Sequence, residues 1–158
     1  MTTFTKGATD KSVVIRIVDE TTGQPRTDVT EASTDLEFFY RRYGAVVTTF
    51  SPAALASASA AHTDGGIKHL AAGYYRLDLP DAAIASGVDS VLVGGTLDAG
   101  TIIGTEVQLV DYDPAIGAHL PPIADAIWDE ARAGHVTAGT FGEYVTANTT
   151  LVEGSDAT

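Results

Sequence analysis

Apolar and polar residues that alternate with a spacing of two limit the fold of this chain more than any other feature. The apolar set in residues 12–19 is Val13, Ile15 and Ile17, and residues 74–79 repeat the pattern. Successive side chains of a strand point to opposite faces, so each pattern predicts a half-buried β-strand. Such strands need a second layer to cover their apolar face, which favours a mainly β protein.

Similar short strands are predicted along the first two thirds of the chain, with Gly- and Pro-containing turns about every 8–12 residues. The predicted strands are 12–19, 35–42, 45–50, 67–70, 74–79, 88–97 and 102–110. Residues 53–61 are expected to form a short helix or an irregular connection, and residues 81–87 one or two helical turns. This arrangement is typical of an immunoglobulin-like antiparallel β-sandwich.

The sandwich is the central part of the predicted domain organisation. It is flanked by extended termini and followed by a short helical appendage. The predicted parts are an N-terminal arm at 1–11, the sandwich at 12–111, a linker at 112–122, a helix–turn docking element at 123–145 and a polar tail at 146–158.

The apolar spacing changes from strand-like to helical after residue 122. Ile123, Ile127 and Ala131 form one stripe, and Trp128, the single tryptophan, widens it. An isolated helix of fewer than ~12–15 residues is marginal in water, so this stripe needs a surface to pack against. A second short helical segment is expected near residue 140. We therefore predict docking or assembly roles for Ile123, Ile127, Trp128, Ala131, Phe141 and Tyr144, on this subunit or on a neighbour.

The composition argues against several classes of function. A formal net charge of −12 would repel a phosphate backbone, so nucleic acid is not expected as a partner. The absence of cysteine excludes disulfides, thiolate metal sites and a cysteine nucleophile. No apolar run approaches the ~20 residues of a membrane helix, and the polar N-terminus does not resemble a signal peptide. We expect no membrane association, and synthesis in a cytoplasm.

Two groups of residues suggest metal binding, but neither has a full ligand pattern. His62 and Asp64 lie near His69 in a Gly-rich turn, which does not hold ligands rigidly. Asp111 and Asp113 could offer oxygen ligands to calcium, yet the glycine and distal glutamate of a calcium loop are missing. Solvated side chains are the favoured interpretation of both groups, so no metal and no cofactor are predicted.

Catalysis is also not predicted. No Gly-x-Ser-x-Gly elbow or phosphate-binding glycine loop occurs. The carboxylate pairs Asp78 with Asp81 and Asp19 with Glu20 fall at strand ends and turns, where exposed acids are ordinary. Hydrolase activity would require a buried pair in a cleft.

Tyrosines offer a different kind of site. A sugar-stacking face on Tyr43 or Tyr74 is an alternative, because an aromatic ring with a polar tip suits carbohydrate.

Two stretches resemble repeated features of tailed-bacteriophage virion proteins. The first joins TDGG at residues 63–66 to GYYRLDLPDAA at residues 73–83. The second is IADAIWDEA at residues 123–131, with GH at 134–135 and TAGTFG at 137–142. In those proteins a β-sandwich precedes this helix–turn phrase.

The resemblance implies a non-enzymatic virion structural protein, made in the cytoplasm of the bacterial host. The expected place is the capsid surface, as a decoration or head-fibre protein, with a tail-fibre or baseplate adaptor as the alternative. The expected partners are the major capsid protein or tail and fibre proteins, together with other copies of this chain. A carbohydrate-binding module for host attachment is a further alternative.

Overall fold

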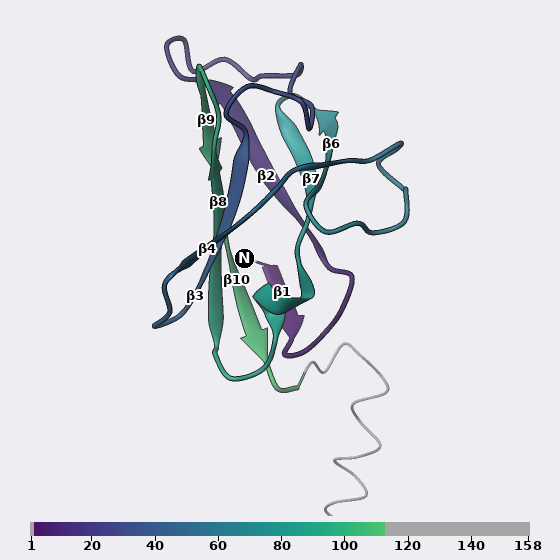
Figure 1. The fold of residues 1–158 in the computed structure, drawn as a ribbon, viewed down its shortest axis with the longest axis vertical. Helices are drawn as coiled ribbons and strands as arrows, with labels where there is room; N and C mark the ends of the chain where they lie inside the picture. Colours follow the sequence, from purple (N-terminus) through teal and green to yellow (C-terminus); the bar gives the residue numbers. More distant parts are fainter. Residues whose placement is uncertain (1, 113–158) are drawn as a thin grey trace, which may run out of the picture. The chain divides into compact units, whose positions relative to one another are not determined.

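The computed structural model describes residues 2–112, which form a β-sandwich of two five-stranded sheets (Figure 1). This confirms the mainly β prediction. The predicted docking element at 123–145 and the tail at 146–158 lie outside the described residues. Within them, the elements are β1 (Thr2–Thr5), β2 (Ser12–Asp19), β3 (Glu37–Arg42), β4 (Val47–Phe50), β5 (Ala53–Ala54), β6 (Gly66–Ala71), β7 (Tyr74–Asp78), a 3₁₀ turn (Asp81–Ile84), β8 (Ser90–Thr96), β9 (Gly100–Ile103) and β10 (Thr105–Val110).

The two sheets contain both parallel and antiparallel pairs. One has the order β1-β10-β8-β3-β4 and the other β5-β6-β7-β2-β9. Most neighbours are antiparallel, as predicted, but β1 pairs in parallel with β10 and β5 pairs in parallel with β6. The prediction of purely antiparallel sheets is therefore wrong, and both exceptions involve short strands at an end of a sheet.

Strand β1 lies in the segment predicted as an arm. Thr2–Thr5 pair along their whole length with β10, and Lys6 N donates to Val110 O at 2.9 Å. Phe4 packs against the core. A polar segment can join a sheet because the ladder uses backbone groups, which every residue except proline provides.

The core lies between the sheets and follows the predicted alternation. Val13, Ile15 and Ile17 of β2 are buried, as are Tyr75 and Leu77 of β7. They face the buried side chains of the other sheet, which are Phe38, Tyr40, Val91, Val93, Val107 and Leu109. The apolar sets of residues 12–19 and 74–79 are thus confirmed as core faces.

The last predicted strand divides between the two sheets. Residues 100–103 pair with β2, whereas residues 105–110 pair with β8. Gly104 lies at the change, and a Cβ atom there would stand 2.2 Å from Val93 O. A residue without a side chain is needed for this close backbone approach.

The β3–β4 hairpin is confirmed. Ala45 N donates to Arg42 O at 2.9 Å, and Gly44 takes a φ of +73° in the third position of this turn. Residues 55–65 form an irregular loop after β5, and residues 81–84 make a single 3₁₀ turn. No helix within residues 2–112 has the length and apolar character needed to cross a membrane.

Candidate functional site

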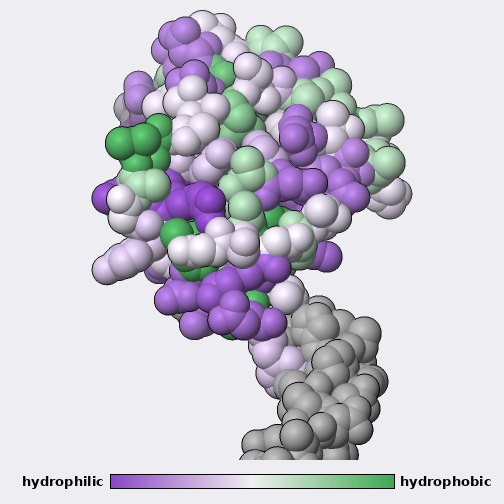
Figure 2. Space-filling view, turned by 60° about the horizontal axis from the view of Figure 1, so that its bottom comes forward, coloured by the Kyte–Doolittle hydropathy of each residue, from purple (hydrophilic) through white to green (hydrophobic). Residues whose placement is uncertain are grey.

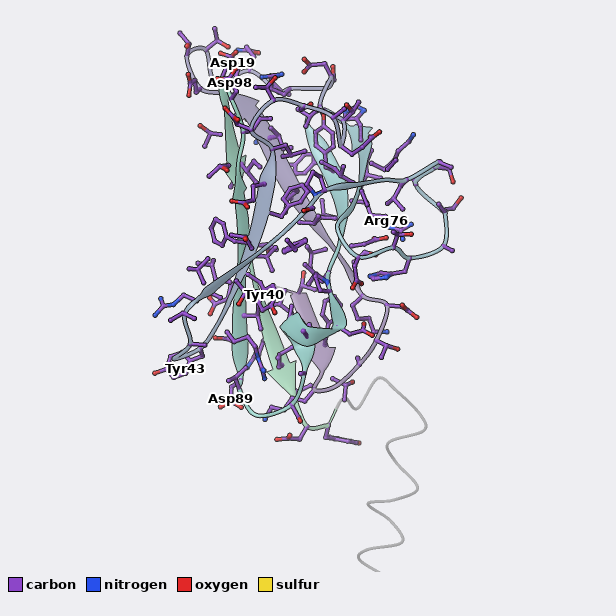
Figure 3. All side chains as sticks on the ribbon, viewed as in Figure 1. Asp19, Tyr40, Tyr43, Arg76, Asp89 and Asp98 are labelled. Atoms are coloured by element: carbon purple, nitrogen blue, oxygen red, sulfur yellow. The ribbon has the colours of Figure 1, made fainter. Side chains whose placement is uncertain are left out.

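The predicted glycan-binding tyrosines do not share a surface. Tyr43 lies at the tip of the β3–β4 hairpin and is 77% exposed (Figure 3). Tyr74 is 44% exposed and lies on β7, in the other sheet, where the Arg16 guanidinium stands 5.5 Å from its ring centre. A stacking platform that uses both rings is therefore excluded, and Tyr43 remains as a single exposed ring.

Exposed apolar residues concentrate near that hairpin. Tyr43, Val46 and Val47 belong to it, and Leu92 lies on the neighbouring strand β8. The register of β4, β3, β8 and β10 places Val47, Arg41, Leu92 and Glu106 in one row across the sheet. Figure 2 shows that apolar and polar groups are interspersed on the face it presents, as they are in this row. A mixed apolar and charged surface suits contact with a protein or a sugar.

An open hollow of about 490 Å³ adjoins the same row. Arg41, Arg42, Tyr43, Leu92 and Glu106 contribute to its lining. It offers two guanidinium groups, a carboxylate, a phenol and apolar surface, which could hold a polar ligand by hydrogen bonds and stacking.

The two arginines of this hollow are held by backbone carbonyls. Arg42 Nη2 donates to Ala85 O at 2.7 Å and to Ser86 O at 2.6 Å, and Arg41 Nε donates to Ala45 O at 3.1 Å. The buried Nε of Arg42 has no hydrogen-bond partner among the described residues. Arg42 therefore ties β3 to the end of the 3₁₀ turn.

A second polar group lies on the other sheet, and it is buried. Asp78 was predicted on the wet face of its strand, but its exposed fraction is 0%. Its Oδ1 accepts from Arg76 Nε at 2.6 Å and from Ser12 Oγ at 2.6 Å, and its Oδ2 accepts from Arg76 Nη2 at 2.9 Å and from Thr63 N at 3.0 Å. Asp78 is buried because the loop at 55–65 covers the end of β7.

Arg76 also holds that loop directly. Its Nη1 donates to Ala58 O at 2.9 Å and to Ala60 O at 2.8 Å. Figure 3 shows Arg76 beside the loop, on the opposite side of the molecule from Tyr43. We call Ser12, Thr63, Arg76 and Asp78, with these two carbonyls, the Arg76 network.

The charge on Asp78 is stabilised by its partners. Burial alone would raise the pKa of this carboxyl, but the hydrogen bonds from Arg76, Ser12 and Thr63 outweigh burial, and the pKa lies below its usual value of 3.8. A carboxylate that stays ionised with all its acceptor sites engaged is a poor general acid. Asp78 instead holds the loop at 55–65 against the end of β7. That Asp78 and Asp81 do not form a catalytic pair stays a prediction. Asp81 instead accepts from Asp10 N at 2.9 Å.

Asp19 of the other acidic pair and the two histidines also have structural partners. Asp19 caps a turn by accepting from Thr22 N at 2.7 Å, and hydrogen bonds from Thr22 hold the pKa of Asp19 below its usual value. His62 Nδ1 lies 3.3 Å from Asp10 Oδ1, while the His69 ring packs at a tilt of 59° against Tyr75, with ring centres 5.0 Å apart.

The groups considered for metal binding do not assemble in the described part of the chain. Residues 2–112 contain no group of three or more suitable His, Asp or Glu side chains. Asp111 forms an ion pair with Lys6 at 3.0 Å, and Lys6 also contacts Asp89 at 2.9 Å. The hydrogen bonds that Lys6 donates to Asp89 and to Asp111 raise the pKa of Lys6. Asp113 lies outside the described residues.

The predicted docking residues are not among the described ones either. Ile123, Ile127, Trp128, Ala131, Phe141 and Tyr144 all follow residue 112. Sequence reasoning missed the Arg76 network and the row through Val47. The spacing of Arg76 and Asp78 on one face of a strand is the one sequence signal that could have indicated the Arg76 network. The row through Val47 could not be found without the register between strands that are distant in the sequence.

Known protein-family models, curated protein sequences and solved structures gave no match to this chain.

Proposed function

We propose that this chain is a non-enzymatic structural protein of a tailed-bacteriophage particle, with its sandwich displayed on the virion. One observation carries the proposal: a β-sandwich at residues 2–112 precedes the helix–turn phrase at 123–142, and the virion proteins that the sequence resembles have these parts in this order. The capsid surface is the favoured place, as a decoration or head-fibre protein. A tail-fibre or baseplate adaptor is the alternative.

The proposal includes an immunoglobulin-like arrangement of the strands. In that fold the last strands and the C strands share one sheet, and strands B, E and D share the other. Strands β10, β8, β3 and β4 correspond to G, F, C and C′, while β2, β7 and β6 correspond to B, E and D. The pairing of β9 with β2 departs from this scheme, because it brings the start of the last strand into the second sheet.

Attachment is assigned to the stripe of Ile123, Ile127 and Trp128. The stripe is assigned this role because an amphipathic helix of this length needs a surface to pack against. Packing of this stripe against a neighbour or against this subunit would contribute about 25 cal/mol of stabilising free energy for each Å² of apolar surface buried. The partners of this stripe are other virion proteins, and the particle forms in the host cytoplasm.

The test is made on the phage or prophage that encodes the chain. Particles purified on a density gradient should contain the protein by mass spectrometry, in a fixed ratio to the major capsid protein. Ile127→Asp with Trp128→Asp should reduce the particle-bound fraction at least tenfold. Asp129→Asn with Arg132→Gln, which lie outside the stripe, should leave it unchanged. Absence from wild-type particles would overturn the virion role, and normal incorporation of the first variant would overturn the assigned attachment.

A carbohydrate-binding role is the second candidate, favoured by the hollow beside Tyr43. One exposed ring, two arginines and a glutamate could stack on and hydrogen-bond to a sugar. A glycan array should then show a signal that Tyr43→Ala removes and that Tyr74→Ala keeps, since Tyr74 lies on the other sheet. An array without signal would contradict this candidate.

A further inference from the structure

The outer edge of β4 is open. Among residues 2–112, this strand is the last in its sheet and pairs only with β3. We define the β4 edge as residues 46–50, whose side chains are all exposed except that of Phe50, which is partly buried. Within residues 2–112, none of the backbone hydrogen bonds outside the strand ladders involves the β4 edge. Its outward N–H and C=O groups are therefore available to another strand.

The β4 edge also lacks the charges that usually protect such a strand. Residues 43–61 contain no Asp, Glu, Lys, Arg or His, although the whole chain has a net charge of −12. Soluble proteins commonly place lysine or another charge on an exposed edge to prevent pairing. The other ends of the sheets differ: β5 has two residues, β9 continues into the opposite sheet, and β1 is followed by Lys6.

Local irregularity protects only one end of the β4 edge. The turn joins Ala45 to Arg42, whereas the ladder joins Val47 to Arg41. Val46 is thus left as an extra residue, and its side chain is 83% exposed. The remaining run Val47–Phe50 is a regular strand of β-branched and aromatic residues, which pair well across strands.

We propose that β4 pairs antiparallel with β4 of a second copy of this chain. The twofold axis passes through Thr48, so that Thr48 faces its own counterpart and Val47 faces Thr49 of the second copy. Two five-stranded sheets then form one continuous ten-stranded sheet. Closed twofold contacts of this kind are the commonest way in which soluble chains associate.

The β4 edge favours a second copy as the occupant because every copy offers the same uncharged strand. Two chains of −12 repel each other, but residues 43–61 carry no charge and add nothing to that repulsion. Pairing through Thr48 places no ionised side chains of β4 opposite one another. Exposed Val47 and Leu92 of each copy lie on the same side of the joined sheet, where the Val47 row of one copy meets the row of Thr49 and Phe39 in the other.

The absence of cysteine permits a direct test on the full-length chain. Thr48→Cys introduces a single thiol at the axis, where facing Cβ atoms of paired strands stand about 4.5–5.5 Å apart. Mild oxidation should convert most of it to a disulfide-linked dimer. Thr27→Cys, at an exposed loop position, is the matched control and should stay mainly monomeric.

Sedimentation over a range of protein concentrations supplies the second readout. The wild-type chain should show a concentration-dependent dimer. Thr48→Lys places two ammonium groups opposite each other and should raise the dissociation constant about fivefold to tenfold, whereas Thr27→Lys should not. A chain that is monomeric throughout, or a dimer equally stable in Thr48→Lys, would overturn the inference, as would equal cross-linking of the two cysteine variants. This inference does not depend on the virion role, and either can fail alone.

Discussion

The two halves of the uncharged segment 43–61 differ in whether their backbone is paired with the rest of the sandwich. The second half, from β5 to residue 61, is held against the sandwich: Ala53 N donates to Gly65 O, and the carbonyls of Ala58 and Ala60 accept from Arg76. The first half contains the β4 edge, which faces solvent with its outer backbone groups unpaired by the rest of residues 2–112. Neither half carries a charge, but their compositions differ: residues 43–52 include β-branched and aromatic side chains, whereas residues 53–61 are mainly Ala and Ser.

A partly buried arginine, Arg76, contributes to this contrast. Arg76 reaches the loop because Asp78, on the same strand and the same face, neutralises its charge and fixes its orientation. Near the β4 edge, Arg41 and Arg42 are both directed to other carbonyls. Arg76 therefore holds the carbonyls of residues 58 and 60, whereas Arg41 reaches only Ala45 O, just before the β4 edge, and within residues 2–112 no arginine bonds to residues 46–50.

Breaking the Arg76 network should have the largest effect. Arg76→Met leaves the buried Asp78 carboxylate unpaired, and loss of one partner from a buried pair typically costs about 3–5 kcal/mol. Urea unfolding should show this loss, and proteolysis should begin within residues 55–61. Arg16→Met on the neighbouring strand is the control and should cost about 1 kcal/mol, because the Arg16 guanidinium lies over the partly exposed ring of Tyr74 and forms no ion pair within residues 2–112. Equal losses would show that the network does not hold the loop.

Substitution of Gly65 should destabilise the region around residues 53–61 by a smaller amount. It has a φ of +78°, and an added Cβ would stand 2.1 Å from Ser51 O. Gly65→Ala should lower the free energy of unfolding by about 2–3 kcal/mol, from backbone strain plus displacement of Ser51. Gly23 has a φ of +69° with open space around it, so Gly23→Ala should cost only the strain, about 1 kcal/mol. If the two variants are equally stable, the close approach to Ser51 is not constraining.

Low pH should destabilise the attachment of residues 53–61, because the Asp78 carboxylate becomes protonated. The pKa of this carboxyl is lower in the folded protein than its usual value of 3.8, so the unfolded chain takes up the proton first as pH falls. The contribution of Asp78 is complete above about pH 4–5 and is lost as pH falls through the lowered pKa. In Asp78→Asn the free energy of unfolding should change less steeply over this range, as measured by urea midpoints at stepped pH. An unchanged slope would assign the pH dependence to Asp19 and Asp28, whose pKa values are also lowered.

A charge placed on the β4 edge should have the smallest effect on the stability of the monomer. Thr48→Lys, measured in dilute solution where the chain is monomeric, should alter the free energy of unfolding by no more than about 0.5 kcal/mol, because the side chain is exposed. Thermal unfolding measures this. A loss above 1.5 kcal/mol, well beyond the range typical of exposed sites, would show that Thr48 supports the fold of its own subunit.

Prediction from sequence succeeded where burial is periodic. Residues 12–19 and 74–79 alternate because one face meets the core, and that pattern is local. Strand β1 was missed because Thr2–Thr5 contain a single apolar residue, Phe4, and join the sheet through backbone pairing. The division at Gly104 was missed because both halves of the strand have the same residue types, and only contact with Val93 shows the change.

The candidate surfaces were less predictable than the strands. Asp78 was expected in solvent because its position alternates with Leu77, but the loop that buries it comes from a distant part of the sequence. Tyr43 was predicted as an exposed ring, which is correct, although its separation from Tyr74 needed the strand order of both sheets. Long-range pairing decides such features, and one sequence does not report it.

The placement of β10 has a mechanical consequence. The described chain leaves the sandwich directly after this strand, which is bonded on one side to β1 and on the other to β8. Hydrogen bonds of a ladder lie across the strands, so a pull along β10 loads both ladders in shear, with many bonds resisting together. If the C-terminal residues anchor the protein, drag on the displayed sandwich would be borne by the N-terminal strand as well. Strand β1, with Lys6, would then hold β10 against this load.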